Sequence, residues 1–276
     1  MSLRFRVLGS GSSGNATLVE AGGTRVLIDA GLGPRTLAER LQSAGVDPAS
    51  LSAVFLSHEH SDHARGAAAF SAKWGVRLCG TRGTYAAVGL GAAEIAGYDV
   101  LPPGASRVVG SLSVTGVAIP HDAAEPLAFL VSWEGVSFGH ATDLGHVAPG
   151  VAAAFRSCEA VLVESNYDPA MLRVGPYPWS LKERIVSPVG HLSNGDVARY
   201  LDGALGPSCR TVVLAHLSEK NNHPELVRMA AETSLERSGR RDVAVTIAAR
   251  DGTGWIDVGG TGARPAPKAG GQLSLW

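Results

Sequence analysis

The stretch that decides the fold is Ala53-Val54-Phe55-Leu56-Ser57-His58-Glu59-His60-Ser61-Asp62-His63, where four potential metal ligands follow a short apolar run. The apolar run predicts a buried strand, and the ligands then stand in the loop that leaves it. In such a loop His58 and His60 can face one ion, while Asp62 and His63 project toward a second. A single His beside an acid is usually a solvated loop residue, but four ligands at this spacing argue against chance. Imidazole and carboxylate suit zinc, manganese or iron, and ions roughly 3.5–4 Å apart can clamp both oxygens of a displacement. The pattern predicts a two-metal hydrolytic centre.

The HxHxDH pattern after a strand resembles the signature of the metallo-β-lactamase superfamily of hydrolases. The resemblance implies an α/β (α+β) fold, a single-domain four-layer αββα sandwich. It also implies that further site residues follow later apolar stretches of the chain. By this resemblance His58, His60 and His121 hold one ion, Asp62, His63 and His216 hold the other, Asp143 bridges the two, and Asp29 gives structural support from beneath.

Composition is compatible with one large domain, which we place at residues 1–258, followed by a tail at 259–276. Hydrophobic residues make up 45% of the chain, enough for a sizeable core. No apolar run reaches the length of a membrane span, and the first residues do not resemble a signal peptide, so we expect a cytoplasmic protein without a membrane partner. The net charge of −1 means that a nucleic-acid enzyme would need a local basic patch.

Periodicity predicts strands that alternate with helices in two halves of similar order, which fits an αββα sandwich with the site at its edge. A tight turn is expected at Glu134-Gly135. The strands are expected at 4–8, 16–20, 24–29, 112–119, 127–133, 136–138, 160–163, 211–214 and 243–247, and the helices at 34–44, 62–74, 147–155, 181–185, 194–205 and 224–238.

Residues outside the metal set must select the substrate, because such a centre serves many reactions. His191 is placed like an extra His in nuclease branches of the superfamily, where it supports or protonates the leaving group. A phosphodiester needs this help, since its alkoxide leaves poorly and a His can donate a proton near neutral pH. Asp62 is expected to accept or orient the proton of the attacking water. Ser193, Asn194 and Ser218 are candidate phosphate contacts; alternatively, Ser193 or Asn194 caps a helix and His191 merely packs.

Residues 3 to about 225 resemble the YycJ subfamily. The motifs are Gly9-Ser10-Gly11-Ser12-Ser13-Gly14-Asn15, the metal set, Glu164-Ser165-Asn166-Tyr167-Asp168, Gly190-His191-Leu192-Ser193-Asn194 and His216-Leu217-Ser218-Glu219-Lys220-Asn221-Asn222. The resemblance implies a 5′-to-3′ double-strand DNA exonuclease that acts in DNA repair or replication, of the mismatch-repair type. The glycine-rich loop is either a phosphate cradle or a plain hairpin turn. Arg173, Lys182 and Arg184 are either backbone contacts or a solvated helix face.

The C-terminal end is rich in Gly, Ala and Pro over residues 259–271, which is typical of a flexible linker. It closes with Gln272-Leu273-Ser274-Leu275-Trp276. This pentapeptide resembles the motif that docks bacterial replication and repair proteins on the DNA polymerase sliding clamp. Gln272, Leu273, Leu275 and Trp276 are the expected clamp-binding residues, because apolar and aromatic groups dominate such short anchors. A tail that folds back on its own domain is the alternative.

Two rival functions remain open at this point. One is a small-molecule metallohydrolase, such as a cyclic phosphodiesterase or a lactone or ester hydrolase, which the near-neutral charge favours. The other is a clamp-tethered regulatory protein whose metals are structural. The ligand types suit two divalent ions per chain, either Zn²⁺ or Mn²⁺.

Overall fold

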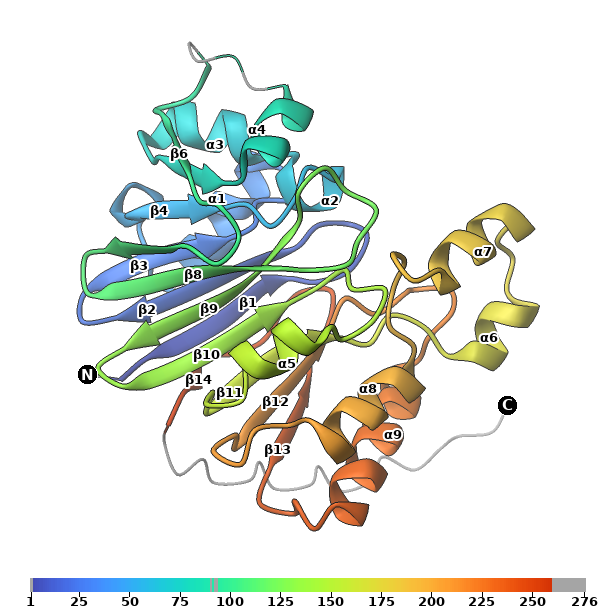
Figure 1. The fold of residues 1–276 in the computed structure, drawn as a ribbon. Coiled ribbons are helices and arrows are strands. Elements are labelled where there is room, and N and C mark those ends of the chain that lie inside the picture. The colour runs from blue at the N-terminus through green and yellow to red at the C-terminus, as the bar shows by residue number, and fades with distance from the viewer. Residues whose placement is uncertain (1, 90, 92–93, 260–276) are drawn as a thin grey trace.

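Two seven-stranded mixed sheets lie face to face in the computed structural model, which describes residues 2–89, 91 and 94–259 (Figure 1). The first sheet has the order β14-β1-β2-β3-β4-β5-β6 and the second β13-β12-β11-β10-β9-β8-β7. The first comprises β1 (Arg4–Gly9), β2 (Ala16–Ala21), β3 (Thr24–Ile28), β4 (Ala53–Phe55), β5 (Leu78–Gly80), β6 (Tyr98–Val100) and β14 (Ile256–Asp257). The second comprises β7 (Ser106–Val109), β8 (Leu112–Ala118), β9 (Leu127–Trp133), β10 (Val136–Ala141), β11 (Ala160–Glu164), β12 (Thr211–Ala215) and β13 (Ala244–Ile247).

The main core fills the space between the two sheets. Phe5 of the first sheet stacks on Phe138 of the second with ring centroids 4.0 Å apart. Phe55 meets Phe129 edge to face at 5.8 Å. All four rings are fully buried, so aromatic pairs join the two sheets within this core.

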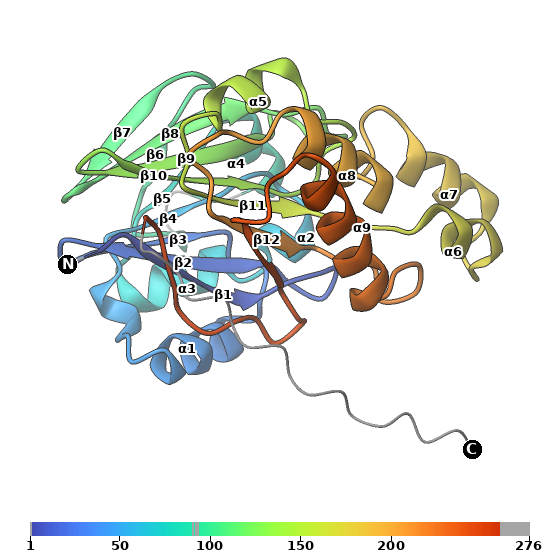
Figure 2. The ribbon, with the colours of Figure 1, turned by 90° about the horizontal axis from the view of Figure 1, so that it is seen from below.

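Helices cover the outer face of each sheet, which completes the predicted αββα order (Figures 1 and 2). Apolar side chains from the helices share a buried cluster with the sheet beneath them. On the first sheet lie α1 (Pro34–Ser43), the 3-10 turn η1 (Pro48–Ser50), α3 (Ala67–Trp74) and α4 (Arg82–Val88). On the second lie α5 (Pro149–Ala154), α8 (Asn194–Gly203) and α9 (Pro224–Arg237). The predicted fold class is confirmed.

Two further helices, α6 (Pro169–Val174) and α7 (Trp179–Val186), stand out from the sandwich beside α8 (Figures 1 and 2). The sequence predicts only part of this region, a helix at 181–185. None of the helices in the described ranges has both the length and the apolarity needed to traverse a bilayer. The predicted tail at 259–276 lies, apart from Gly259, outside the described residues.

The helix predicted at 62–74 is wrong in one respect, because the chain forms α2 (Ser61–Ala64) and then α3 with a break between them. Gly66 marks the break, where its N–H donates to Ala30 O at 2.8 Å. A Cβ on Gly66 would lie 2.1 Å from Leu32 O, so the chain passes too close to the preceding loop for any other residue. The Glu134-Gly135 turn is confirmed, with positive φ at both residues (46° and 83°).

Candidate metal centre

The predicted site residues follow the carboxyl ends of strands that run in the same direction. β3 and β4 pair in parallel, as do β10, β11 and β12, and β8 runs parallel to β10 because both are antiparallel to β9. Side chains at the carboxyl ends of such strands meet at one edge. Asp29 follows β3, His58 follows β4, His121 follows β8, Asp143 follows β10, and His216 follows β12.

Three of these residues have a left-handed backbone. φ is 62° at Asp29, 59° at Asp143 and 53° at His216, and the described residues contain just one other non-glycine residue with positive φ, Glu134 in its turn. This conformation is uncommon outside Gly, Asn, Asp and His. Its recurrence at strand ends that meet in one place marks a functional site.

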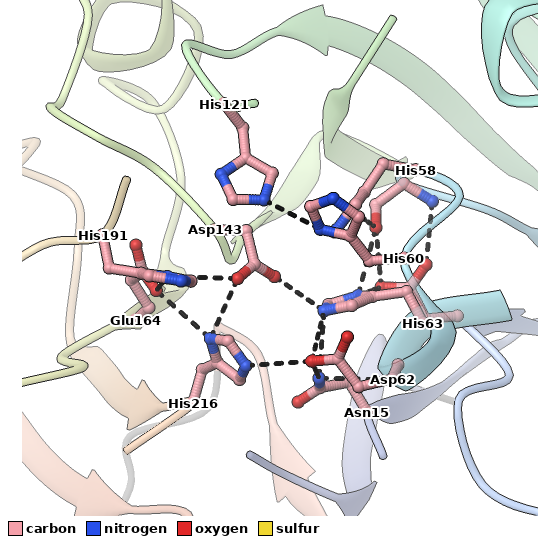
Figure 3. Close-up of polar contacts among 12 residues, drawn as sticks. Asn15, His58, His60, Asp62, His63, His121, Asp143, Glu164, His191 and His216 are labelled. Atoms are coloured by element: carbon pink, nitrogen blue, oxygen red, sulfur yellow. Dashed lines mark hydrogen bonds and ion pairs between the residues drawn. The ribbon is translucent and has the colours of Figure 1, made fainter. Parts of the chain in front are cut away.

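Three histidine rings converge in the first cluster (Figure 3). His60 Nδ1 lies 3.0 Å from His58 Nε2 and 3.2 Å from His121 Nε2. Ser57 Oγ, which donates to Asp29, accepts from His58 Nδ1 at 3.0 Å, and the carbonyl oxygen of Val189 accepts from His121 Nδ1 at 3.1 Å. With protons on these Nδ1 atoms, the Nε2 atoms of His58 and His121 carry free lone pairs. Both Nε2 atoms lie within 3.2 Å of His60 Nδ1. A cation suits this arrangement.

The second cluster gathers Asp62, His63 and His216, with Asp143 between the two clusters. His63 Nδ1 lies 2.8 Å from Asp29 Oδ2, so Nδ1 carries the proton and Nε2 is a lone pair. His63 Nε2 nonetheless lies 2.6 Å from Asp143 Oδ2. Asp62 Oδ2 lies 3.5 Å from His63 Nε2 and 3.4 Å from His216 Nε2. Electron-rich atoms this close repel one another unless positive charge lies between them.

Orphaned polar atoms test whether these residues fit a metal. Asp143 Oδ2 and His216 Nε2 are both buried without a hydrogen-bond partner. Buried polar atoms are almost always paired, and an unpaired one calls for an ion or another explanation. Since both atoms belong to the predicted ligand set, the residues present fit a centre for two divalent cations.

Glu164 begins one of the motifs that resemble the YycJ subfamily, but the sequence alone assigns it no role in the site. It ends β11, is fully buried, and accepts backbone N–H groups of Leu144 (2.6 Å) and Leu192 (3.0 Å) on Oε1. Its Oε2 lies 3.0 Å from His191 Nδ1 and 3.2 Å from His216 Nδ1. This single carboxylate therefore orients a predicted ligand and the predicted proton donor. Its position at the end of an apolar strand, like that of Asp143, was the available signal.

His191 lies beside the clusters, with Nδ1 3.2 Å from Asp143 Oδ1 and its ring 5.5 Å from that of His121. Burial lowers the pKa of His191, but the Glu164 and Asp143 carboxylates outweigh burial and raise the pKa above its ordinary value. The carboxylates around His191 therefore favour its protonated form.

The glycine-rich loop braces the site from the side of the first sheet. Gly11 N–H donates to Asn15 Oδ1 at 2.9 Å, and Asn15 N–H donates to Asp62 O at 2.7 Å. The Asn15 amide also lies 3.0 Å from His63 Nε2, while Ser10 Oγ accepts from His216 N–H at 2.8 Å. These groups are engaged inside the protein, which favours a supporting role over the predicted phosphate cradle. Asn15 is a second site residue absent from the predicted set.

The three predicted phosphate contacts have protein partners. Ser193 caps α8 in a capping box with Asp196, as the alternative interpretation predicted. Asn194 Oδ1 accepts from Ser165 Oγ at 2.8 Å, and Ser218 Oγ accepts from Asn221 N–H at 3.2 Å. All three are buried, so they shape the loops that carry His191 and His216. Contact with substrate by these side chains stays a prediction.

The chain can now be compared with known proteins. Residues 9–163 match the family model described as the metallo-beta-lactamase superfamily. The chain belongs to this superfamily. It is 32% identical over 251 residues to Exodeoxyribonuclease WalJ of Streptococcus pneumoniae, an alignment that covers 90% of this chain and 92% of the relative. It is 33% identical over 241 residues to Exodeoxyribonuclease YycJ of Bacillus anthracis, which covers 87% and 91%. The predicted resemblance to the YycJ subfamily is confirmed.

A solved structure agrees with the fold. The metallo-beta-lactamase fold protein YhfI from Bacillus subtilis superposes with a TM-score of 0.73, over 93% of this chain and 100% of that one. Its sequence identity is 17%, so this likeness concerns the fold alone.

Proposed function

We propose that this protein is a two-metal exodeoxyribonuclease that hydrolyses phosphodiester bonds of double-strand DNA from the 5′ end. The observation that carries the proposal is that His191 pairs with Glu164 and also lies next to Asp143, the carboxylate between the two clusters. A DNA phosphodiester expels an alkoxide, which is a poor leaving group, and a histidine beside the two clusters can supply the proton that this oxygen needs. The two exodeoxyribonuclease relatives support DNA as the substrate.

Divalent ions at the two clusters would supply Lewis acidity toward the phosphate oxygens. His58, His60 and His121 are the proposed ligands of one ion, Asp62, His63 and His216 those of the other, and Asp143 is shared. Asp29 holds His63 in the tautomer that leaves Nε2 free. Zn²⁺ or Mn²⁺ suits this donor set.

The remaining steps belong to the protein's own side chains. Asp62, whose carboxyl group ordinarily ionises well below neutral pH, orients the attacking water or accepts its proton. His191 donates its proton to the departing oxygen, and Glu164 keeps the ring in the required orientation. The site therefore separates a proton acceptor at one cluster from a proton donor on the far side of Asp143.

The test is turnover of a duplex labelled at either the 5′ or the 3′ end, with Mn²⁺ and with Zn²⁺, beside bis(p-nitrophenyl) phosphate. Progressive loss from the 5′ end supports the proposal. Loss from the 3′ end contradicts the polarity alone. Turnover of the small ester without cleavage of DNA contradicts the nuclease and favours the small-molecule hydrolase.

We further propose that Gln272, Leu273, Leu275 and Trp276 dock on a DNA polymerase sliding clamp and bring the enzyme to repair and replication sites in the cytoplasm. These residues lie outside the described ones, and the sequence motif carries this proposal. The 259–271 segment would act as a tether that raises the local enzyme concentration on DNA. Deletion of 272–276 should lower activity on clamp-loaded DNA and leave activity on naked DNA unchanged. Equal activity of both forms on clamp-loaded DNA contradicts clamp docking.

A further inference from the structure

Residues 169–189, here called the arm, leave the metal centre and return to it. The arm begins where Asp168 caps α6 through Ala170 N–H, shortly after Glu164, and ends shortly before His191. Its returning limb contacts the first cluster, because the carbonyl oxygen of Val189 accepts from His121 Nδ1 at 3.1 Å. The arm therefore rises directly from the edge that holds the metal ligands.

The arm has an ordered core of its own. Leu172 and Ile185 are buried together with Tyr167, and Tyr177 and Leu181 pack against them. At its base, Arg184 Nε donates to Asp122 Oδ2 at 2.5 Å, next to His121. Helices α6 and α7 are thus held as a unit against the site, although they project from the sandwich (Figure 1).

Outside that core the arm presents large apolar groups to solvent. Val174 is 80% exposed, Trp179 69% and Val186 54%. With Val189, they are four of the eight large hydrophobic residues that are exposed in the described chain. Trp179 Nε1 donates to Glu183 Oε1 at 2.7 Å, which fixes the ring edge and leaves the ring faces open. An exposed, oriented indole on a segment that holds half of the exposed large hydrophobic residues of the described chain marks an interaction surface.

The charge of the arm is opposite to that of the rest of the chain. The arm carries Arg173, Lys182 and Arg184 against the single acid Glu183, a net charge of +2. The whole chain has 24 basic and 25 acidic residues, which leaves 21 against 24 elsewhere, a net charge of −3. Lys182 Nζ donates to Arg173 O at 2.8 Å, and neither cation makes an ion pair within the described residues. Arg184 is paired with Asp122, so Arg173 and Lys182 are the cations that this segment offers to a negatively charged partner.

We propose that the arm is the docking platform for the DNA strand that the metal centre cleaves, which deepens and rests on the proposed function. Trp179 stacks on a base, and Arg173 and Lys182 contact the neighbouring phosphates. Proteins grip single strands in this way, by stacking on an aromatic ring beside cations, so Trp179 takes an unpaired base at the opened end of the duplex. A strand held there reaches the site at the base of the arm, where Val189 contacts His121 and the chain continues to His191. The unpaired cations favour a polyanion such as DNA, because a neutral protein surface would gain only from the apolar groups.

The first test compares Trp179→Ala and Trp179→Phe in the metal-loaded enzyme. Loss of one stacked base should lower kcat/KM for duplex DNA about 5- to 150-fold. Trp179→Phe should restore most of it, and turnover of bis(p-nitrophenyl) phosphate should stay unchanged in both. Met229→Ala, which removes a 63% exposed side chain on α9, is the matched control. Trp179 is exposed, so the variants should fold like the wild type.

The second test reverses charge. Arg173→Glu should raise KM for DNA and reduce the salt dependence of binding by about one counterion. Arg35→Glu makes the same charge change at a 92% exposed side chain on α1, and it should alter neither quantity.

If the wild type cleaves DNA, and both Trp179→Ala and Arg173→Glu cleave it with unchanged kinetics, the platform is overturned. The proposal of a nuclease would then still stand. A wild type that cleaves only the small ester would overturn both. Binding of a protein through the arm with unaltered DNA kinetics would also overturn the platform.

Discussion

Replacement of Glu164 by Gln is the sharpest test of how the metal centre is organised. Glu164 is fully buried, and four donors surround it: two backbone N–H groups on Oε1, and the Nδ1 atoms of His191 and His216 on Oε2. Gln has nearly the same shape, so its carbonyl oxygen can keep both backbone bonds. Its NH₂ group then faces two Nδ1–H groups, donor against donor.

His216 can escape this conflict by moving its proton from Nδ1 to Nε2, whereas a protonated His191 can escape it only by losing its Nδ1 proton. In His216 the proton then occupies the Nε2 lone pair that is predicted to bind the second ion. Loss of the group that orients a metal ligand typically lowers metal affinity 10- to 100-fold, about 1.4–2.7 kcal/mol. The three-histidine cluster has no contact with Glu164 in the described structure, so its ion should remain. We expect one tightly bound ion in place of two. Turnover should fall by at least the same factor as the affinity for the second ion.

Calorimetric titration of the metal-free protein with Mn²⁺ or Zn²⁺ counts the sites and gives their affinities. Glu159→Gln is the control, because this glutamate accepts from Ser137 N–H at 2.7 Å where β11 begins, the end opposite the site. If Glu164→Gln binds two ions with wild-type affinity and turns DNA over at the wild-type rate, the carboxylate does not set the tautomers and the reasoning fails.

Three further predictions address other parts of the structure. His191→Ala should keep both ions but lower turnover about 10²- to 10⁴-fold, whereas His60→Ala should lose metal; equal metal loss by elemental analysis would refute the division of roles. Burial holds the pKa of His140 at about 4, below its ordinary value of 6.5, so the unfolded state takes up a proton first. Stability should therefore fall as pH drops from 6.5 to 4, by up to about 3 kcal/mol, and denaturant unfolding of His140→Gln should show a smaller fall. A Cβ on Gly31 would lie 1.6 Å from Asp62 O, so Gly31→Ala should destabilise the protein by about 3 kcal/mol or more. Gly33 has open space around it, so Gly33→Ala should unfold near the same denaturant concentration as the wild type.

Much of the candidate site could be predicted because its residues stand at strand ends. His121, Asp143 and His216 lie far apart in the chain, yet each follows an apolar run, and parallel strands bring their carboxyl ends to one edge. Glu164 obeys the same rule and begins one of the motifs, yet the sequence assigns it no role. Its role depends on pairing with His191 and His216, which the sequence does not display. A glutamate that ends a strand is otherwise an ordinary solvated residue.

The helix at 62–74 failed for a related reason. Its apolar periodicity is sound over residues 67–74, and nothing local forbids the turns before them. The break at Gly66 arises because the loop at Ala30 and Leu32 passes against it, a contact between segments far apart in the chain. Local propensity cannot report such a contact.

The left-handed residues connect the stability of the sandwich to the chemistry at its edge. A strand that continued in extended conformation through Asp29, Asp143 or His216 would carry these side chains past the edge and apart. A left-handed residue turns the chain sharply instead, so each side chain projects over the ends of its neighbours' strands. Three such residues cost on the order of 1 kcal/mol each or more, and Gly would adopt the conformation with less strain. Local stability alone would favour Gly at all three positions. The residues found there are instead two carboxylates and an imidazole, and the strained backbone brings their side chains together. The aromatic packing between the sheets stabilises the fold and so offsets this strain.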